Sequence, residues 1–218
     1  MKRQGSQPPR DGGRHWLPSQ GVDPAPLTEL NAECLGLLVM RAAERDLMMP
    51  APPLLATLHS QWAALPAHAV RRLAAAPFSL FDAGFASAPR WLELRSRGVH
   101  ELPQRGEPAY FEATVARSIT RRMLVYGWHL ARSRPRAACL VFGSTVAAVE
   151  SLAACSLVAL EAAAERNADA LRPRWANQFV FWRALLVAAS DGADHRLHEL
   201  LLGGLQRLAA ETLAAHDS

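Results

Sequence analysis

Lysine, β-branched residues and closely spaced cysteines are all scarce in this 218-residue sequence. Lys2 is the only lysine, which in practice excludes a P-loop or Schiff-base lysine in the body of the chain. The β-branched residues never alternate with polar ones, so no strand or hairpin is predicted. The three cysteines have no CxxC spacing and lie among apolar residues, which argues against a disulfide framework and is typical of core thiols.

Long hydrophobic runs are missing as well. The longest uncharged stretch near the middle, residues 137–149, has 13 residues, whereas a membrane span needs about 18. The basic residues at the N-terminus are not followed by the apolar segment of a secretory signal. We therefore expect no membrane span and a cytoplasmic location.

Arginine, alanine and leucine dominate the residues that are present, a usage typical of a GC-rich bacterial genome. The net charge of +4 is only mildly basic. Residues 1–26 contain five prolines and four glycines, and we predict that they form a disordered tail. Residues 27–218 are expected to form a single α-helical domain, because their length suits one core.

The spacing of apolar residues predicts an all-α globule of about eight or nine helices. The expected helices span residues 27–46, 54–65, 66–76, 89–97, 111–134, 144–154, 157–171, 179–190 and 194–215. Thr28 is expected to cap the first of them, and Pro135 to end or kink the helix that begins at residue 111. The segment 77–85 carries three phenylalanines and is expected to fill the core.

The helix over residues 111–134 has the clearest pattern. Its apolar residues recur every three or four positions and fall within one stripe: Phe111, Val115, Ile119, Met123, Tyr126 and Leu130. A second stripe lies nearly opposite and consists of Arg117, Arg121, Trp128 and Arg132. The sequence therefore predicts one buried face and one basic face on this helix.

The same region has no acidic residue between Glu112 and Glu150, but it has six arginines. Such a surface could bind phosphate backbones or an acidic protein surface. The alternative is that acids from elsewhere in the fold pair with these arginines. The candidate residues for binding a protein partner or nucleic acid are Arg117, Arg121, Trp128, Arg132, Arg134 and Arg136.

Motifs that carry catalysis or bind cofactors are absent from the sequence. It contains no HExxH, GxSxG, GxGxxG or GxxxxGK[ST]. His195 and His198 are three residues apart beside acids, but we interpret this group as a solvated helix start. We therefore expect no catalytic residue, metal or cofactor, although a pair of catalytic carboxylates stays open.

A local resemblance lies in the segment FGSTVAAVESLAACSLVALEAAAERN, residues 142–167. This segment resembles the conserved region of FlhD, a subunit of the flagellar transcriptional regulator. The matching residues are Phe142, Gly143, Leu152, Ala153, Ser156, Leu157, Leu160, Ala164, Glu165 and Asn167. The resemblance implies a regulatory, partner-binding fold. As a helix-turn-helix, its second helix would present Glu161 and Glu165 to DNA, where two acids oppose the phosphates.

Together these patterns favour a non-enzymatic bacterial regulatory or adaptor protein that acts through protein–protein contacts. A first alternative is an adaptor in a secretion or motility apparatus, and a homo-oligomer is left open. A second alternative is an all-α enzyme or small-ligand protein with an aromatic-lined pocket. The aromatic residues available for that pocket are Trp62, Phe78, Phe81, Phe85, Trp91, Trp175 and Trp182.

Overall fold

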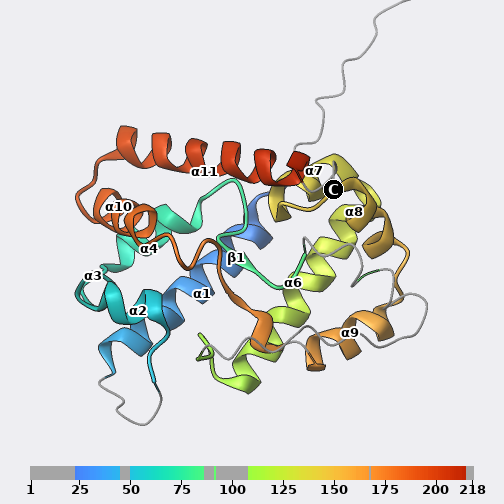
Figure 1. Ribbon diagram of the computed structural model, residues 1–218, viewed down its shortest axis with the longest axis horizontal. Helices are drawn as coiled ribbons and strands as arrows, with labels where there is room; N and C mark the ends of the chain where they lie inside the picture. Colours follow the sequence, from blue (N-terminus) through green and yellow to red (C-terminus); the bar gives the residue numbers. More distant parts are fainter. Residues whose placement is uncertain (1–22, 45–49, 86–90, 92–107, 167, 215–218) are drawn as a thin grey trace, which may run out of the picture.

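A computed structural model describes residues 23–44, 50–85, 91, 108–166 and 168–214. The predicted all-α fold is confirmed, because nearly all of the regular structure in these ranges is helical (Figure 1). Most of the predicted tail and the predicted helix 89–97 lie outside the described residues. The helices are α1 (Ala25–Ala43), α2 (Pro53–Thr57), α3 (His59–Ala63), α4 (Ala67–Ala74), α6 (Ala113–Ser133), α7 (Pro135–Phe142), α8 (Val146–Ala153), α9 (Leu157–Arg166), α10 (Phe179–Ser190) and α11 (Asp194–Ala214).

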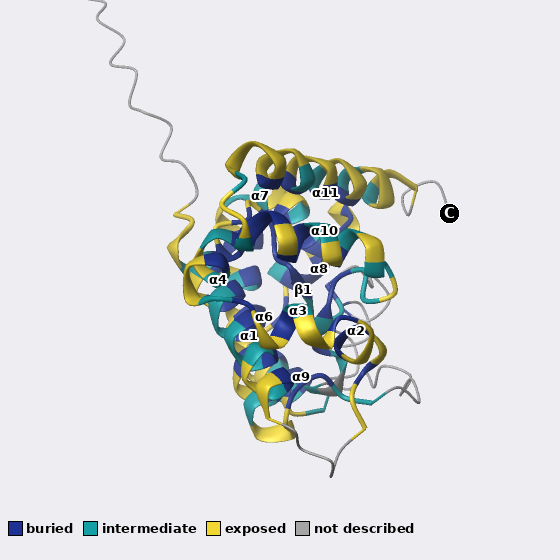
Figure 2. Ribbon diagram, turned by 90° about the vertical axis from the view of Figure 1, so that its left-hand side faces the viewer, coloured by how far each residue is buried: buried dark blue, intermediate teal, exposed yellow. Residues whose placement is uncertain are grey.

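The helices form two groups that share one core. Helix α1 packs on α3 and α4, and α10 packs on α3, α4 and α11. Helix α6 packs on α7, α8 and α9, and it also touches α1. Helix α11 runs across the top of both groups, from α10 to α7 (Figure 1). Figure 2 shows buried residues turned inward on these helices and exposed residues on their outer faces.

Aromatic side chains fill the centre of the core. Phe78, Phe81 and Phe85, from the segment expected to fill it, are all at most 1% exposed. The rings of Trp62 and Trp182 are also fully buried, with their centroids 5.6 Å apart. Burial of such large apolar side chains is the main stabilising contribution to a fold of this size.

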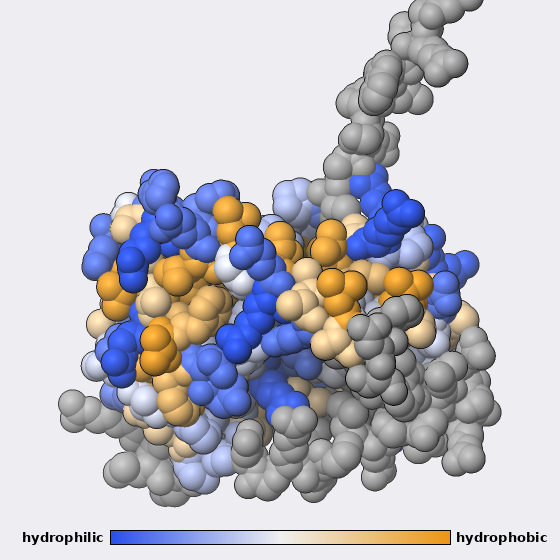
Figure 3. Space-filling model, turned by 45° about the horizontal axis from the view of Figure 1, so that its top comes forward, coloured by the Kyte–Doolittle hydropathy of each residue, from blue (hydrophilic) through white to orange (hydrophobic). Residues whose placement is uncertain are grey.

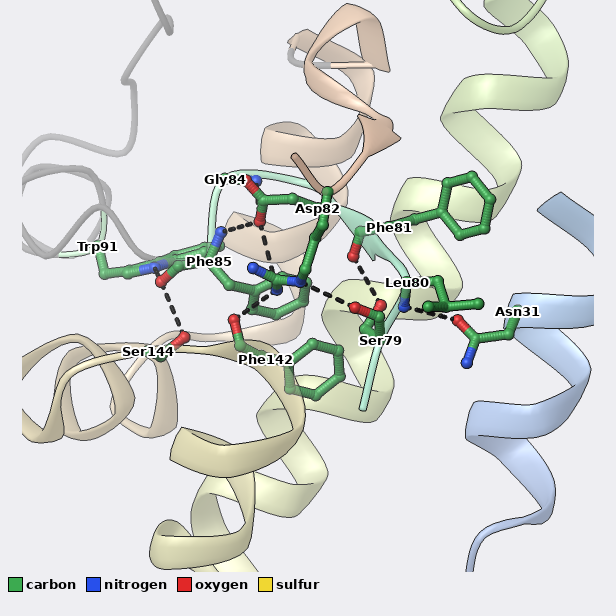
Figure 4. A network of polar contacts seen from close by, with 11 residues as sticks. Asn31, Ser79, Leu80, Phe81, Asp82, Gly84, Phe85, Trp91, Phe142 and Ser144 are labelled. Carbon is green, nitrogen blue, oxygen red and sulfur yellow. Dashed lines mark hydrogen bonds and ion pairs between the residues drawn. The ribbon is translucent and has the colours of Figure 1, made fainter. Parts of the chain in front are cut away.

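A buried asparagine holds the phenylalanine segment in place. The Asn31 amide donates to the backbone carbonyl of Phe78 at 3.1 Å. Its oxygen accepts from the backbone N–H of Leu80 at 3.0 Å, as Figure 4 shows. Ser79 donates its hydroxyl to the carbonyl of Phe81 at 2.6 Å, also within the core. Because buried backbone groups need partners, these bonds allow a non-helical segment to cross the interior.

Several helix boundaries differ from the predicted ones. The predicted helix 54–65 divides into α2 and α3 at Leu58, whose ψ of 28° leaves the helical region. Helix α1 begins at Ala25 with Pro24 as its N-cap residue, so the prediction that Thr28 caps it is wrong. Pro135 ends α6 and also begins α7, because proline suits the first turn of a helix. The helix predicted from residue 144 begins at Val146, where the Thr145 hydroxyl accepts from the N–H of Ala148 at 3.2 Å.

Two short strands form the one sheet in the described ranges, and no pattern in the sequence predicted them. Strand β1 (Phe81–Asp82) pairs antiparallel with β2 (Arg172–Pro173), and Asp82 lies opposite Arg172. Each strand has only two residues, which is too short for an alternating pattern to be detected. A 3₁₀ turn (Ala168–Ala170) connects α9 to β2.

No single helix in the described ranges is long and apolar enough to cross a membrane. Helices α7 and α8 would have the length and composition together, but the chain bends by 115° between them.

Candidate functional site

Helix α6 carries most of the predicted site and has a well-formed start. Glu112 is its N-cap residue, and its carboxylate accepts from the backbone N–H groups of Thr114 and Val115 at 3.0 and 3.1 Å. These two backbone hydrogen bonds hold the pKa of Glu112 below its ordinary value. A cap of this kind fixes where the helix begins and hence which side chains share a face.

Helix α9 runs antiparallel to α6 along the predicted basic face. Arg117 forms an ion pair with Glu165 at 3.2 Å, and Arg121 forms one with Glu161 at 2.5 Å. Farther along α6, the Trp128 indole N–H donates to the carbonyl of Cys155 at 2.9 Å. Residue numbers therefore rise along α6 as they fall along the facing chain, and this register brings acids onto the arginines.

The acid-free region is thus partly neutralised by distant acids. Arg122 also forms an ion pair, with Glu33 of α1. The alternative that acids elsewhere pair with these arginines therefore holds for Arg117, Arg121 and Arg122. All of these pairs are substantially exposed, so each contributes little to stability. They leave little unbalanced charge on this half of the predicted site.

The other three arginines meet no carboxylate among the residues that the structure describes. Arg132 places its guanidinium carbon 4.6 Å from the centroid of the Trp128 ring, which is a cation–π contact. Arg134 is both the C-cap residue of α6 and the N-cap residue of α7, and Arg136 lies in the first turn of α7. We call Trp128, Arg132, Arg134 and Arg136 the basic corner.

Exposed apolar side chains lie close in sequence to Arg136 and to the carbonyl that Trp128 binds. Leu140 is 52% exposed and lies one helical turn beyond Arg136 on α7. Leu157 and Val158 are 48% and 75% exposed and follow Cys155, to which Trp128 is bonded. The basic corner therefore presents positive charge beside apolar surface.

Exposed apolar residues are not confined to this corner. Figure 3 shows hydrophobic side chains in separate areas on the face that carries α11, with hydrophilic side chains between them. Helix α10 contributes Val180 and Val187, which are 81% and 44% exposed. Apolar exposure alone therefore does not single out a site. The basic corner is distinguished by three arginines, close together in sequence, that all lack a carboxylate partner among the described residues.

A separate cavity of about 560 Å³ lies beside the β1–β2 pair. Its polar lining includes Asp82, Arg172, Arg174, Asn177 and Glu211. Sequence reasoning left residues 172–178 between two predicted helices and named only Trp175 of them for a pocket, so it did not predict this cavity. The one available signal was a cluster of polar and proline residues between two apolar helices.

Most of the aromatic residues proposed for the pocket of the second alternative lie in the core. Six of the seven aromatic residues proposed for it are at most 1% exposed and belong to the core: Trp62, Phe78, Phe81, Phe85, Trp91 and Trp182. Only Trp175 lines the cavity, where it is joined by Tyr110 and Phe179.

The residues weighed as metal ligands show no metal geometry. His195 Nδ1 lies 3.6 Å from Glu199 Oε1, and both side chains are exposed. No group of three His, Cys, Asp or Glu side chains in the described parts of the chain could hold a metal ion.

Comparison with protein-family models, curated proteins and solved structures finds no match to this chain. The resemblance to FlhD therefore stays a prediction. Within that segment, the Ser156 hydroxyl accepts from the N–H of Ala159 at 3.2 Å, at the start of α9. The acids that a helix-turn-helix would turn toward DNA, Glu161 and Glu165, are instead paired with arginines of α6.

Proposed function

We propose that this protein is a non-enzymatic adaptor that binds an acidic surface of a partner protein through the basic corner. The observation that carries the proposal is the division among six arginines of one acid-free region. Three of them meet carboxylates within the chain, and Arg132, Arg134 and Arg136 meet none among the described residues. An acidic partner would supply the missing charge.

The surroundings of the basic corner favour a protein partner over a nucleic acid. Phosphate backbones gain little from apolar contact, whereas protein interfaces combine an apolar centre with charged groups around it. Leu140, Leu157 and Val158 supply that apolar surface. Tryptophan and arginine are also the residue types that most often dominate protein-binding energy.

The contacts behind Trp128 support the proposal further. Its indole N–H is bonded to Cys155, and Arg132 lies over its ring. A side chain that is already ordered loses less conformational entropy on binding. Identifying the partner would decide between two roles. One is a role in transcription, which the FlhD resemblance implies, and the other is a role in secretion or motility.

The test is an affinity capture with the tagged full-length protein from cells of its source organism, with and without nuclease. We expect a protein partner that survives nuclease and is lost from the variant R132E/R134E/R136E. The matched control is R71E/R183E/R196E, which changes the net charge equally at three exposed arginines elsewhere.

Two results would overturn the proposal. Equal loss of the partner from both variants would show a non-specific charge effect. Recovery that depends on intact nucleic acid would instead assign the basic corner to phosphate binding.

A further inference from the structure

The cavity beside the β1–β2 pair has the size of a small-molecule site. Its volume of about 560 Å³ lies within the range of about 300–1,000 Å³ that is typical of ligand pockets. Polar groups enter it from β1, β2 and α11, and Trp175 and Phe179 give it an apolar side. It is remote in sequence from the basic corner and independent of the function proposed above.

Both carboxylates of the cavity already have partners within the protein. Asp82 Oδ1 accepts from the backbone N–H groups of Gly84 and Phe85, each at 3.1 Å (Figure 4). Glu211 Oε1 accepts from the Trp175 indole N–H at 2.9 Å and lies 3.5 Å from Arg207. Neither acid is therefore the group that a ligand would need to satisfy.

Arg174 supplies one of the two guanidinium groups of the cavity, and it makes its hydrogen bonds within the protein. It is buried, and it donates to the carbonyls of Ser79 at 2.8 Å and Phe142 at 2.5 Å. Asp82 lies 3.8 Å from it. Burial lowers the pKa of Arg174, and the charges of Asp82 and Glu211 oppose that shift.

Arg172 supplies the other guanidinium group, and this group is not held by contacts of that kind. Arg172 lies opposite Asp82 across the strand pair. Its half-buried side chain makes no hydrogen bond or ion pair with any residue in the described ranges. Asp82 lies near Arg174, and Glu211 is shared between Trp175 and Arg207. The positive charge of Arg172 is therefore left without a negative partner in the cavity.

The apolar side of the cavity is held in a fixed position. The Trp175 ring meets Phe181 edge-on at 5.3 Å and Phe78 edge-on at 5.9 Å between centroids. Its backbone has a φ of 50°, which is rare for any residue other than glycine. A ligand body can therefore pack against a side chain that does not have to be ordered first.

We propose that this cavity binds a small organic carboxylate, with its anionic group on Arg172 and its apolar body against Trp175. A planar carboxylate matches the two parallel donors of a guanidinium. A single negative charge balances Arg172 alone. The second charge of a phosphate monoester would face Asp82 and Glu211, so the charges favour a monoanion.

The test titrates isotope-labelled full-length protein with phenylacetate, and it follows the indole N–H signal of Trp175 by NMR. The variant Trp175→Phe assigns that signal. We expect phenylacetate to shift it at concentrations up to about 10 mM, the range in which small fragments bind. Neutral phenylacetamide should not shift it, and phenyl phosphate should bind more weakly than phenylacetate.

Arg172→Gln should weaken the binding of phenylacetate by about tenfold or more, because it removes a charge-assisted hydrogen bond. The control Arg71→Gln changes an exposed arginine on α4 and should leave binding unchanged. Four results would overturn the proposal: no shift with phenylacetate, an equal shift with phenylacetamide, tighter binding of phenyl phosphate, or full affinity in Arg172→Gln.

Discussion

Trp128 donates its indole N–H to the backbone carbonyl of Cys155, 27 residues farther along the chain. This bond joins the C-terminal part of α6 to the turn between α8 and α9. It also fixes the ring over which Arg132 lies. One side chain therefore sets both the packing of α6 against α9 and the geometry of the basic corner.

Trp128→Phe should separate these two roles. Phenylalanine keeps an aromatic face for Arg132 but loses the hydrogen bond to Cys155. We expect the free energy of unfolding to fall by about 1 kcal/mol, the net value of a typical hydrogen bond. Urea denaturation followed by circular dichroism measures it. A variant as stable as the parent protein would contradict the structural role of the bond.

The antiparallel register of α6 and α9 can be tested by exchanging charges. Arg121→Glu should place two acids together and reduce stability by less than about 1 kcal/mol, because the pair is exposed. The double variant R121E/E161R should recover most of that loss. Strictly additive effects in urea denaturation would show that these residues do not face each other.

Arg174→Met should lower the free energy of unfolding far more than the same change at Arg172. It leaves the carbonyls of Ser79 and Phe142 without their donor and Asp82 without its cation. Removing one partner of a buried charged pair costs about 3–5 kcal/mol. Arg172→Met is the matched control and should change the free energy of unfolding by less than about 0.5 kcal/mol. Equal losses in thermal denaturation would contradict this difference.

The cap of α6 should make stability depend on pH. The pKa of Glu112 is lowered in the folded protein, so its contribution is complete above the pKa of the unfolded chain. That contribution is lost as the pH falls through the folded-state value. At neutral pH, the Glu112→Gln variant should therefore have a lower melting temperature than the parent protein. This difference in melting temperature should become smaller below about pH 4. A difference in melting temperature that grows in acid would contradict a lowered pKa for Glu112.

The buried thiols should differ in reactivity. Burial raises the pKa of Cys34 strongly, and it raises the pKa of the half-buried Cys139 as well. Because the thiolate is the reactive form, both should react slowly with iodoacetamide at neutral pH. We expect mass spectrometry to find Cys139 labelled first and Cys34 labelled only under denaturing conditions. Prompt labelling of Cys34 in the native protein would contradict its burial.

Sequence reasoning predicted the long helices well but missed features that depend on pairing in space. It placed the helix Phe179–Ser190 correctly, because an apolar run begins there and Asp191-Gly192 ends it. For the acid-free region it left open whether distant acids pair with the arginines, since Glu33, Glu161 and Glu165 reach them only through the packing of α1 and α9 on α6. The cavity depends on two strands too short to leave a periodic signal.

The contacts of the core segment 78–85 have a consequence for the order in which the chain can fold. Asn31 reaches this segment from 49 residues away, so a nascent chain that extends from α1 through this segment can already form that contact. Arg174 reaches it across 95 residues and also bonds to Phe142. Contacts between distant residues close late because of their entropic cost. Synthesis of the C-terminal third is therefore a prerequisite for closing the core, and ribosome-bound intermediates should expose the carbonyl of Ser79 to water until then.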